Sequence, residues 1–337
     1  MTPWQDRIFI IAEAGVNHNG DVDMAHRLVD AAAAAGCDAV KFQTFCAEAL
    51  VSRKARTADY QNANGSGESQ LGMLKRLELP YEAHRELKDH AERRRLLFLS
   101  TAFDAQSVDF LHDLDIPVWK IPSGEITNFP YLVRVAGMQR PIVLSTGMST
   151  MTEIEDAVGV LTRHGADRSR LCILHCNSEY PTPERDVNLR AMVALGEAFG
   201  TAYGYSDHTL GDTIAVAAAA LGARAVEKHL TLDSSLPGPD HRASLEPEAL
   251  KALVKAVRNV ELAMGDGIKR PSPSEEKNRI LARKSLVAAR AIRAGEAFTP
   301  ENVIAKRPAA GLSPMRWTEV MGRAAPRDFA EEELIEL

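Results

Sequence analysis

Short apolar runs alternate along the first 264 residues with longer stretches in which apolar positions recur at helical spacing. Such runs, rich in β-branched residues and bounded by polar loops, are typical of buried strands, whereas a spacing of three and four predicts amphipathic helices. The pattern predicts strands at Ile8–Ala12, Ala39–Gln43, Leu96–Ser100, Pro117–Ile121, Pro141–Ser145, Arg170–His175, Thr201–Tyr205 and Ala225–His229. It predicts helices at Asp23–Ala35, Tyr81–Arg93, Thr152–His164, Leu189–Phe199, Asp212–Leu221 and Pro247–Met264.

This alternation of strand and helix predicts an α/β fold. Short connections between the elements give parallel strands with right-handed crossovers. Eight regular units favour a closed (β/α)8 TIM barrel over the main alternative, an open doubly wound sheet. The chain also lacks the glycine-rich dinucleotide motif that often accompanies the open sheet. We therefore expect residues 1–264 to form a barrel that carries the catalytic site.

The sequence changes character after Met264. Residues 265–282 are rich in proline, glycine and alternating charges and are predicted to be a linker. Residues 283–337 are predicted to form a small domain with short strands at Ser285–Ala288, Glu296–Thr299 and Asn302–Arg307 and a short helix near Pro314–Met321. A unit of this size has a small core, so we expect it to pack on the barrel or on a partner subunit.

Composition narrows the class of protein. Hydrophobic residues make up 45% and charged residues 26% of the 337, and the formal net charge is −6, which argues against a basic nucleic-acid-binding protein. No apolar stretch approaches the roughly 18 residues of a membrane span, and no secretory signal is evident. The four cysteines, too few for a disulfide scaffold, are expected to be reduced thiols. These features predict a cytoplasmic protein that binds neither nucleic acid nor membrane.

Two lysines are predicted to point into the barrel. In Ala39–Gln43, Val40 and Phe42 are expected to face the helices, which leaves Lys41 facing inward, and the same alternation places Lys120 inside. A lysine buried in a barrel costs several kcal/mol unless it has a charged or hydrogen-bonding partner. Two converging lysines predict a site for a dianion such as phosphate. The alternative is that each lysine extends its ammonium group toward water or pairs with a glutamate of the barrel.

The strand ends carry further polar side chains, and a barrel keeps its active site there. The long polar connection from Ala47 to Leu79, which follows the second strand, is predicted to be a lid or binding loop. His208 and His229, on the adjacent seventh and eighth strands, are predicted to bind a divalent ion. Imidazole ligands suit Mn²⁺, Co²⁺ or Zn²⁺ better than an all-oxygen Mg²⁺ site. A phosphate pocket beside such a metal predicts carbon–carbon chemistry on a phosphorylated small molecule.

The chain also resembles the sialic acid synthase family. The resemblance lies in the segments IIAEAGVNHNGD, AVKFQTF, FLSTAFD, KIPSGEITNFPYL, LSTGM, HCNSEYPTP, GYSDHT, EKHLTLD and LPGPDH. The tail RKSLVAARAIRAGEAFTPENVIAKRPAAG resembles the C-terminal antifreeze-like (SAF) domain of that family. The resemblance implies a transferase that condenses phosphoenolpyruvate with an N-acetylated amino sugar and releases phosphate. It also implies a divalent metal, typically Mn²⁺ with Co²⁺ or Mg²⁺ as alternatives, and a domain-swapped homodimer in which each SAF domain caps the other subunit's barrel.

The resemblance assigns roles residue by residue. It implies catalytic roles for Glu13, Glu125, Lys41 and Lys120, with either glutamate handling the proton of the attacking water. It implies phosphoenolpyruvate contacts at Lys41, Thr101, Lys120, Ser123, Ser206 and Ser178, the last standing where some members have asparagine. It implies sugar contacts at Glu13, Gln43, Glu125, Tyr180, Asp240 and, from the partner's SAF domain, Arg307. The metal ligands it implies are His208 and His229.

Variants of these motifs indicate a branch of the family. KIPSGEITN, SEYP and GESQLGMLKRLEL resemble the legionaminic acid synthase branch. That branch takes 2,4-diacetamido-2,4,6-trideoxymannose. The alternatives are a sialic acid synthase that takes N-acetylmannosamine and, after it, a pseudaminic acid synthase. A candidate from another class is a barrel aldolase in which Lys41 or Lys120 forms a Schiff base.

Overall fold

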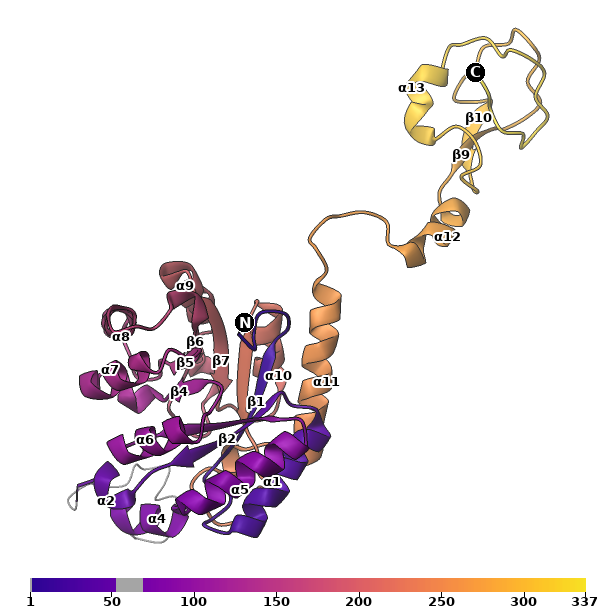
Figure 1. Ribbon diagram of the computed structural model, residues 1–337. Coiled ribbons are helices and arrows are strands. Elements are labelled where there is room, and N and C mark those ends of the chain that lie inside the picture. The colour runs from indigo at the N-terminus through magenta and orange to yellow at the C-terminus, as the bar shows by residue number, and fades with distance from the viewer. Residues whose placement is uncertain (1, 53–68) are drawn as a thin grey trace. The chain divides into compact units, whose positions relative to one another are not determined.

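The computed structural model describes residues 2–52 and 69–337, and the chain divides into two compact units, Met1–Gly265 and Asp266–Leu337. In the first unit, eight parallel strands lie inside a layer of helices (Figure 1). The strands are β1 (Phe9–Gly15), β2 (Ala39–Thr44), β3 (Leu97–Ala102), β4 (Trp119–Ile121), β5 (Ile142–Ser145), β6 (Leu171–Cys176), β7 (Ala202–Asp207) and β8 (Ala225–His229). All eight predicted strands are present.

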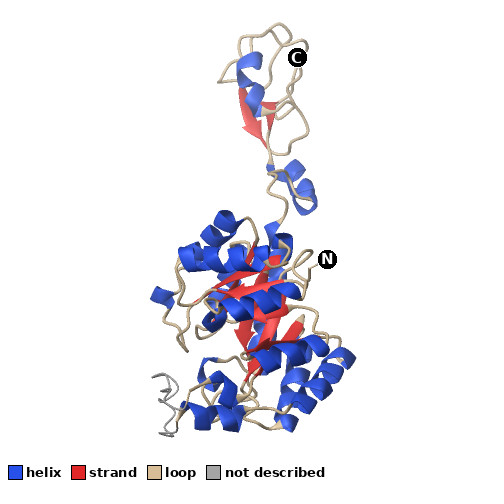
Figure 2. Ribbon diagram, turned by 60° about the vertical axis from the view of Figure 1, so that its left-hand side comes forward, coloured by secondary structure: helices blue, strands red, loops and turns tan. Residues whose placement is uncertain are grey.

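The strands form a nearly closed barrel. Their order is β3-β2-β1-β8-β7-β6-β5-β4, so strands consecutive in the chain are neighbours and β8 closes on β1. The two ends of this order, β3 and β4, pack against each other. The (β/α)8 barrel predicted from the alternating pattern is therefore confirmed, and Figure 2 shows its strands in red among the surrounding helices.

The helices of the first unit follow the strands in order. They are α1 (Val22–Ala35), α2 (Ala47–Leu50), α4 (Gln70–Leu77), α5 (Tyr81–Arg93), α6 (Ala105–Asp113), α7 (Phe129–Gly137), α8 (Met151–Arg163), α9 (Leu189–Phe199), α10 (Thr213–Ala220) and α11 (Pro247–Met264). Local chemistry sets their ends. Asp21 accepts a hydrogen bond from the Met24 amide at the start of α1, and Gly36 ends it with a left-handed φ of 83°.

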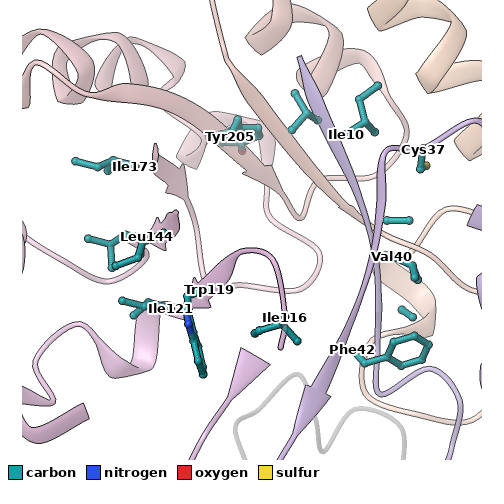
Figure 3. Packing of buried hydrophobic residues seen from close by; sticks show 14 of the residues in the cluster. Ile10, Cys37, Val40, Phe42, Ile116, Trp119, Ile121, Leu144, Ile173 and Tyr205 are labelled. Atoms are coloured by element: carbon teal, nitrogen blue, oxygen red, sulfur yellow. The ribbon is translucent and has the colours of Figure 1, made fainter. Parts of the chain in front are cut away.

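Apolar side chains pack on both faces of the strands. Val40, Phe42, Trp119 and Ile121 face the helices, as predicted, within a continuous buried cluster (Figure 3). A second buried cluster fills the barrel interior with Trp4, Phe9, Ile11, Ala39, Leu99, Val118, Val143, Cys172, Leu174 and Ala225. These residues lie toward the amino ends of the strands, so the core that stabilises the barrel leaves its carboxyl end for polar groups.

The second unit contains two short helices and a small antiparallel sheet. α12 (Pro273–Ala282) is followed by β9 (Ser285–Ala288), which pairs with β10 (Val303–Lys306), and by α13 (Trp317–Val320). The strands predicted at Ser285–Ala288 and Asn302–Arg307 are present. The strand predicted at Glu296–Thr299 is not, because only Ala297 pairs there, in an isolated antiparallel bridge with Ala324. α12 lies within the predicted linker, because Ser272 and Glu275 form a capping box that starts a helix there.

Two predictions about the whole chain concern its helices and cysteines. No helix within residues 2–52 and 69–337 is long and apolar enough to cross a membrane. All four cysteines are free, as predicted: Cys37, Cys46, Cys172 and Cys176.

Candidate active site

A cavity of about 510 Å³ opens at the carboxyl ends of the barrel strands. All but one of the residues assigned from the sequence line it: Glu13, Lys41, Gln43, Thr101, Lys120, Ser123, Glu125, Ser178, Tyr180, Ser206, His208, His229 and Asp240. The exception is Arg307, which is exposed directly after β10 in the second unit. The barrel topology thus brings together side chains from seven strands and the loops that follow them.

Two lysines and two glutamates form the floor of this cavity. Lys41 Nζ lies 2.7 Å from Glu13 Oε2 and 3.3 Å from Thr101 Oγ1. Glu227 Oε2 lies between the lysines, 3.7 Å from Lys41 Nζ and 3.6 Å from Lys120 Nζ. Both lysines are buried and face inward, as predicted. The pairing with barrel glutamates, which the sequence left as an alternative, is present as well.

The charges of this group do not cancel. Burial raises the pKa of Glu227, but Lys120 and Lys41 outweigh it and lower the value to about 2, so this carboxylate stays ionised. Burial raises the pKa of Glu13 to about 7, with Lys41 opposing the shift, so Glu13 is only partly ionised near neutrality. Burial lowers the pKa of Lys41, but Glu13 and Glu227 raise it further, to a net value above the ordinary one. Burial lowers the pKa of Lys120, with Glu227 opposing the shift. With both lysines protonated, the floor carries residual positive charge, which favours an anion.

Serine hydroxyl groups border the lysines. Ser123 Oγ accepts a hydrogen bond from the Gly147 amide at 2.9 Å and lies 3.3 Å from Cys176 Sγ. A Cβ atom added to Gly147 would lie 2.3 Å from Ser178 Oγ and 2.9 Å from Ser123 Oγ. Only glycine at position 147 lets both hydroxyls stand this close to the backbone. Gly147 lies within the segment LSTGM, and the sequence alone predicted no role for it.

The two candidate metal ligands face one another. The rings of His208 and His229 are 5.3 Å apart between centroids, and both side chains are buried. Burial lowers the pKa of His208 to about 4 and that of His229 well below its ordinary value, so both are neutral, as metal binding requires. His208 Nδ1 donates to the carbonyl of Asn177, so Nε2, which lies 3.3 Å from Ser206 Oγ, carries the lone pair that could bind a metal. His229 Nδ1 is buried without a hydrogen bond.

These residues fit a divalent ion that is only partly coordinated by protein. Among the described residues, no group of three or more His, Cys, Asp or Glu side chains is placed to hold a metal. Asp240 Oδ2 lies 3.8 Å from His229 Nδ1. Two imidazoles leave several coordination positions for water or substrate, which is typical of catalytic rather than structural metal sites.

The predicted sugar contacts surround this pair of histidines. The Tyr180 ring packs on His208 with centroids 4.1 Å apart. Gln43 Nε2 donates a hydrogen bond of 3.2 Å to Glu13 Oε1. Burial raises the pKa of Asp240 to about 6, with Lys41 opposing the shift. These polar groups thus stand beside the lysine floor rather than in a separate cleft.

One side of the cavity is apolar, which the sequence analysis did not foresee. We call this surface the apolar wall; it consists of Val16, Leu50, Met73, Leu74, Leu77 and Phe103. These residues come from the loop after β1, from α2 and α4, and from the loop after β3. α2 and α4 belong to the predicted lid or binding loop, of which residues 53–68 lie outside the described part of the chain.

Glu227 is the other functional residue that the sequence analysis passed over. It appears in the sequence only within the segment EKHLTLD, with no role predicted, although it lies 3.7 Å from Lys41 Nζ and 3.6 Å from Lys120 Nζ and accepts a hydrogen bond of 2.9 Å from Ser206 Oγ. The alternation that placed the lysines inside also places Glu227 inside, two residues before His229. That signal was present in the sequence.

Comparisons with known proteins agree with this geometry. The chain matches the NeuB family over residues 28–269 and the SAF domain over residues 283–336. It is 51% identical to an N,N'-diacetyllegionaminic acid synthase of Campylobacter jejuni, covering 98% of this chain and 99% of that protein. A Legionella pneumophila protein of the same name is 45% identical and is matched over 93% of this chain and 89% of its own length.

A solved structure shares the architecture. The crystal structure of an N-acetylneuraminic acid synthetase from Leptospira borgpetersenii, in complex with citrate, has a TM-score of 0.71 to this chain. The sequences are 33% identical, and the match covers 81% of this chain and 90% of the other.

Proposed function

The chain belongs to the NeuB family, and on this basis we propose that it is a nonulosonic acid synthase of the legionaminic type. The reaction joins phosphoenolpyruvate, 2,4-diacetamido-2,4,6-trideoxymannose and water to give N,N'-diacetyllegionaminate and phosphate. The observation that carries the proposal is a cationic floor, Lys41 and Lys120, beside two neutral buried histidines in one cavity.

Phosphoenolpyruvate would bind on the lysine floor. Its phosphate and carboxylate need several cationic and hydroxyl donors, and Lys41, Lys120, Thr101, Ser123 and Ser206 line the same part of the cavity. Ser178, which replaces an asparagine found in some relatives, keeps one hydroxyl donor there. An incoming dianion would give Lys120, whose carboxylate partner is Glu227 at 3.6 Å, a second negatively charged partner.

In the proposed reaction, C3 of phosphoenolpyruvate attacks the aldehyde carbon of the open-chain sugar. Water then adds at C2, and the tetrahedral intermediate expels phosphate by cleavage of its C–O bond. Glu13 or Glu125 takes the proton of the water. Burial raises the pKa of Glu13 to about 7, which suits this residue to exchange a proton near neutrality. Burial also raises the pKa of Glu125, with Asn128 opposing the shift.

His208 and His229 would hold the divalent ion, for which Mn²⁺ is our first candidate and Co²⁺ or Mg²⁺ are alternatives. When bound, such an ion polarises the sugar's aldehyde oxygen as a Lewis acid. The chain's own contribution is to keep both imidazoles neutral and to fix the His208 tautomer through Asn177.

The apolar wall supports the choice of a deoxy, diacetylated sugar. The proposed substrate presents a C6 methyl group and two acetamido methyl groups, where N-acetylmannosamine has a hydroxymethyl group and one acetamido group. Burying a methyl group on an apolar surface is favourable by roughly 0.8 kcal/mol for each CH₂-sized group. The 51% identity to a legionaminic acid synthase, against 33% to the sialic acid synthetase of known structure, supports the same choice.

The proposal includes a homodimer. Arg307, in the SAF domain, would reach the sugar in the barrel of the partner subunit and complete the site. We place the reaction in the cytoplasm, which the four free cysteines support.

The test is phosphate release from phosphoenolpyruvate, measured with the diacetamido sugar and Mn²⁺ and after omission of either. We expect release to need both. Lys120→Met should raise the KM for phosphoenolpyruvate about 10- to 100-fold, the loss of a charged hydrogen bond. The Lys88→Met variant on α5, which removes a half-buried lysine paired with Glu92 outside the cavity, is the matched control and should leave KM unchanged.

The barrel aldolase is tested in the same preparation. A Schiff base needs a neutral lysine. Glu13 and Glu227 raise the pKa of Lys41 although burial opposes them, whereas burial lowers the pKa of Lys120, so Lys120 is the lysine that an aldolase would use. If the chain is a synthase, borohydride with pyruvate should leave the protein unlabelled. Covalent labelling without phosphate release would overturn the synthase proposal in favour of the aldolase.

A further inference from the structure

A buried ion pair joins β7 and β8 on the outer side of the barrel, directly behind the candidate metal ligands. Lys228 Nζ lies 2.8 Å from Asp207 Oδ2, and both side chains are 0% exposed. The two residues are register partners in the sheet. Asp207 stands between Ser206 and His208, and Lys228 stands between Glu227 and His229. The pair thus ties together the two strands that carry four inward-facing site residues.

The same lysine also holds the chain beyond His208. Its ammonium group donates a hydrogen bond of 2.6 Å to the carbonyl of Thr209. Asp207 Oδ1 accepts bonds from the Thr209 amide at 2.9 Å and from Thr209 Oγ1 at 2.7 Å. His208 is therefore flanked on both sides by residues bound to Lys228, and its own carbonyl accepts from the Thr182 amide at 2.9 Å.

Packing alone does not account for charges at this place. The preceding outward pair on the same strands is Tyr205 and Val226, which belong to the buried core that faces the helices. A buried ion pair is often no more stabilising than apolar side chains of similar volume, because both charges lose their hydration. What the pair adds is a fixed spacing between two neighbouring strands and a fixed course of the backbone at residues 207–209.

We propose that Asp207 and Lys228 are positioning residues that set the spacing and orientation of His208 and His229 for a divalent ion. The inference rests on the proposed function, in which these histidines hold the metal. Neither Asp207 nor Lys228 lines the cavity, so they act through the backbone of the histidines rather than by touching substrate. In this respect they resemble outer-shell partners of metal ligands, whose loss weakens metal binding 10- to 100-fold.

The test is Mn²⁺ affinity, measured from the electron paramagnetic resonance signal of free Mn²⁺ during titration of the full-length protein. The double variant Asp207→Asn/Lys228→Met removes both charges together, so neither is left buried and unpaired, and the amide oxygen can still accept from Thr209. We expect its Kd for Mn²⁺ to rise about 10- to 100-fold. The single variant Asp207→Asn keeps the acceptor for Thr209 but puts an amide NH2 group where Lys228 donates, and it leaves the buried Lys228 ammonium unpaired. It should therefore weaken Mn²⁺ binding at least as much as the double variant and lower the unfolding temperature further.

A second ion pair at the opposite end of the barrel provides the control. Arg258 donates a 2.6 Å hydrogen bond to Asp38, which also accepts from the Ile10 amide at 2.8 Å, just before β2. Asp38→Asn/Arg258→Met should lower the unfolding temperature yet leave the Mn²⁺ Kd unchanged. An unchanged Kd in the 207/228 variant, or an equal rise in the control, overturns the positioning role alone. Wild-type protein that binds no Mn²⁺ overturns both this role and the proposed metal site.

Discussion

At the scale of single residues, Gly147 leaves room for two serine hydroxyls of the proposed anion site. Its Cβ position falls on the hydroxyls of Ser178 and Ser123. Gly147→Ala should therefore displace both and lower kcat/KM for phosphoenolpyruvate about 10- to 100-fold, since small misplacements at a reacting centre have effects of that size. Steady-state kinetics with varied phosphoenolpyruvate measures the loss.

Gly124 lies in the same cavity and is the control for that substitution. A Cβ added there meets no atom within 4 Å. Gly124→Ala should retain kcat/KM within about twofold. An equal loss of kcat/KM in both variants would show that the positions of the Ser178 and Ser123 hydroxyls beside Gly147 do not determine kcat/KM.

The raised pKa of Glu13 should make the unfolding free energy depend on pH. Burial raises its folded-state pKa from 4.5 to about 7. Between these values the folded state keeps the proton that the unfolded state has lost, so the contribution of Glu13 to stability should fall as pH rises from about 5 to 7, and then level off. The buried neutral histidines act in the opposite direction, so the effect of Glu13 is the difference between the wild type and Glu13→Gln. Glu13→Gln should remove a decline on the order of 1–3 kcal/mol. Urea unfolding of the metal-free protein at pH 5 and pH 8 measures it.

The matched variant for this comparison is Glu92→Gln, on the exposed side of α5. Its unfolding free energy should follow that of the wild type across the same pH range. If the Glu13→Gln curve also runs parallel to the wild type, then Glu13 does not hold a proton in the folded protein near neutrality.

At the scale of elements, α4 turns an apolar face toward the cavity. Leu74 lines the apolar wall, whereas the neighbouring Lys75 is exposed and pairs with Glu48. Leu74→Ala should lower the ratio of kcat/KM for the diacetamido sugar to that for N-acetylmannosamine about tenfold, since one or two methylene groups of contact have an effect of that order. Lys75→Ala should leave the ratio unchanged. Equal loss for both sugars would contradict a role for the wall in selectivity.

The strands of the barrel could be predicted from the sequence, but some contacts between them could not. The strands were predictable because each is a short apolar run, and the inward direction of Lys41 follows from apolar Val40 and Phe42 on either side. The short distances from Glu227 to both lysines were not predictable from the sequence, because they depend on how far apart β2, β4 and β8 lie in the barrel. The apolar wall was missed for the same reason, since its residues come from connections far apart in the chain.

At the scale of the whole molecule, the central question is whether one site uses residues of two subunits. Arg307→Ala should raise the KM for the sugar about 10- to 100-fold by loss of a charged hydrogen bond. Arg316→Ala, which removes another exposed arginine of the same unit, should not. Mixing Arg307→Ala with His208→Ala protein should restore activity, because a mixed dimer has one complete site. No recovery in verified mixed dimers would contradict the swapped arrangement.

The most direct measurement is a comparison of the two sugars by one enzyme. Phosphate release with phosphoenolpyruvate and Mn²⁺ is measured with 2,4-diacetamido-2,4,6-trideoxymannose and, separately, with N-acetylmannosamine, and each product is identified by mass spectrometry. We predict a higher kcat/KM for the diacetamido sugar and a product with the mass of N,N'-diacetyllegionaminate. Preference for N-acetylmannosamine, or no condensation product from either sugar, would contradict the account.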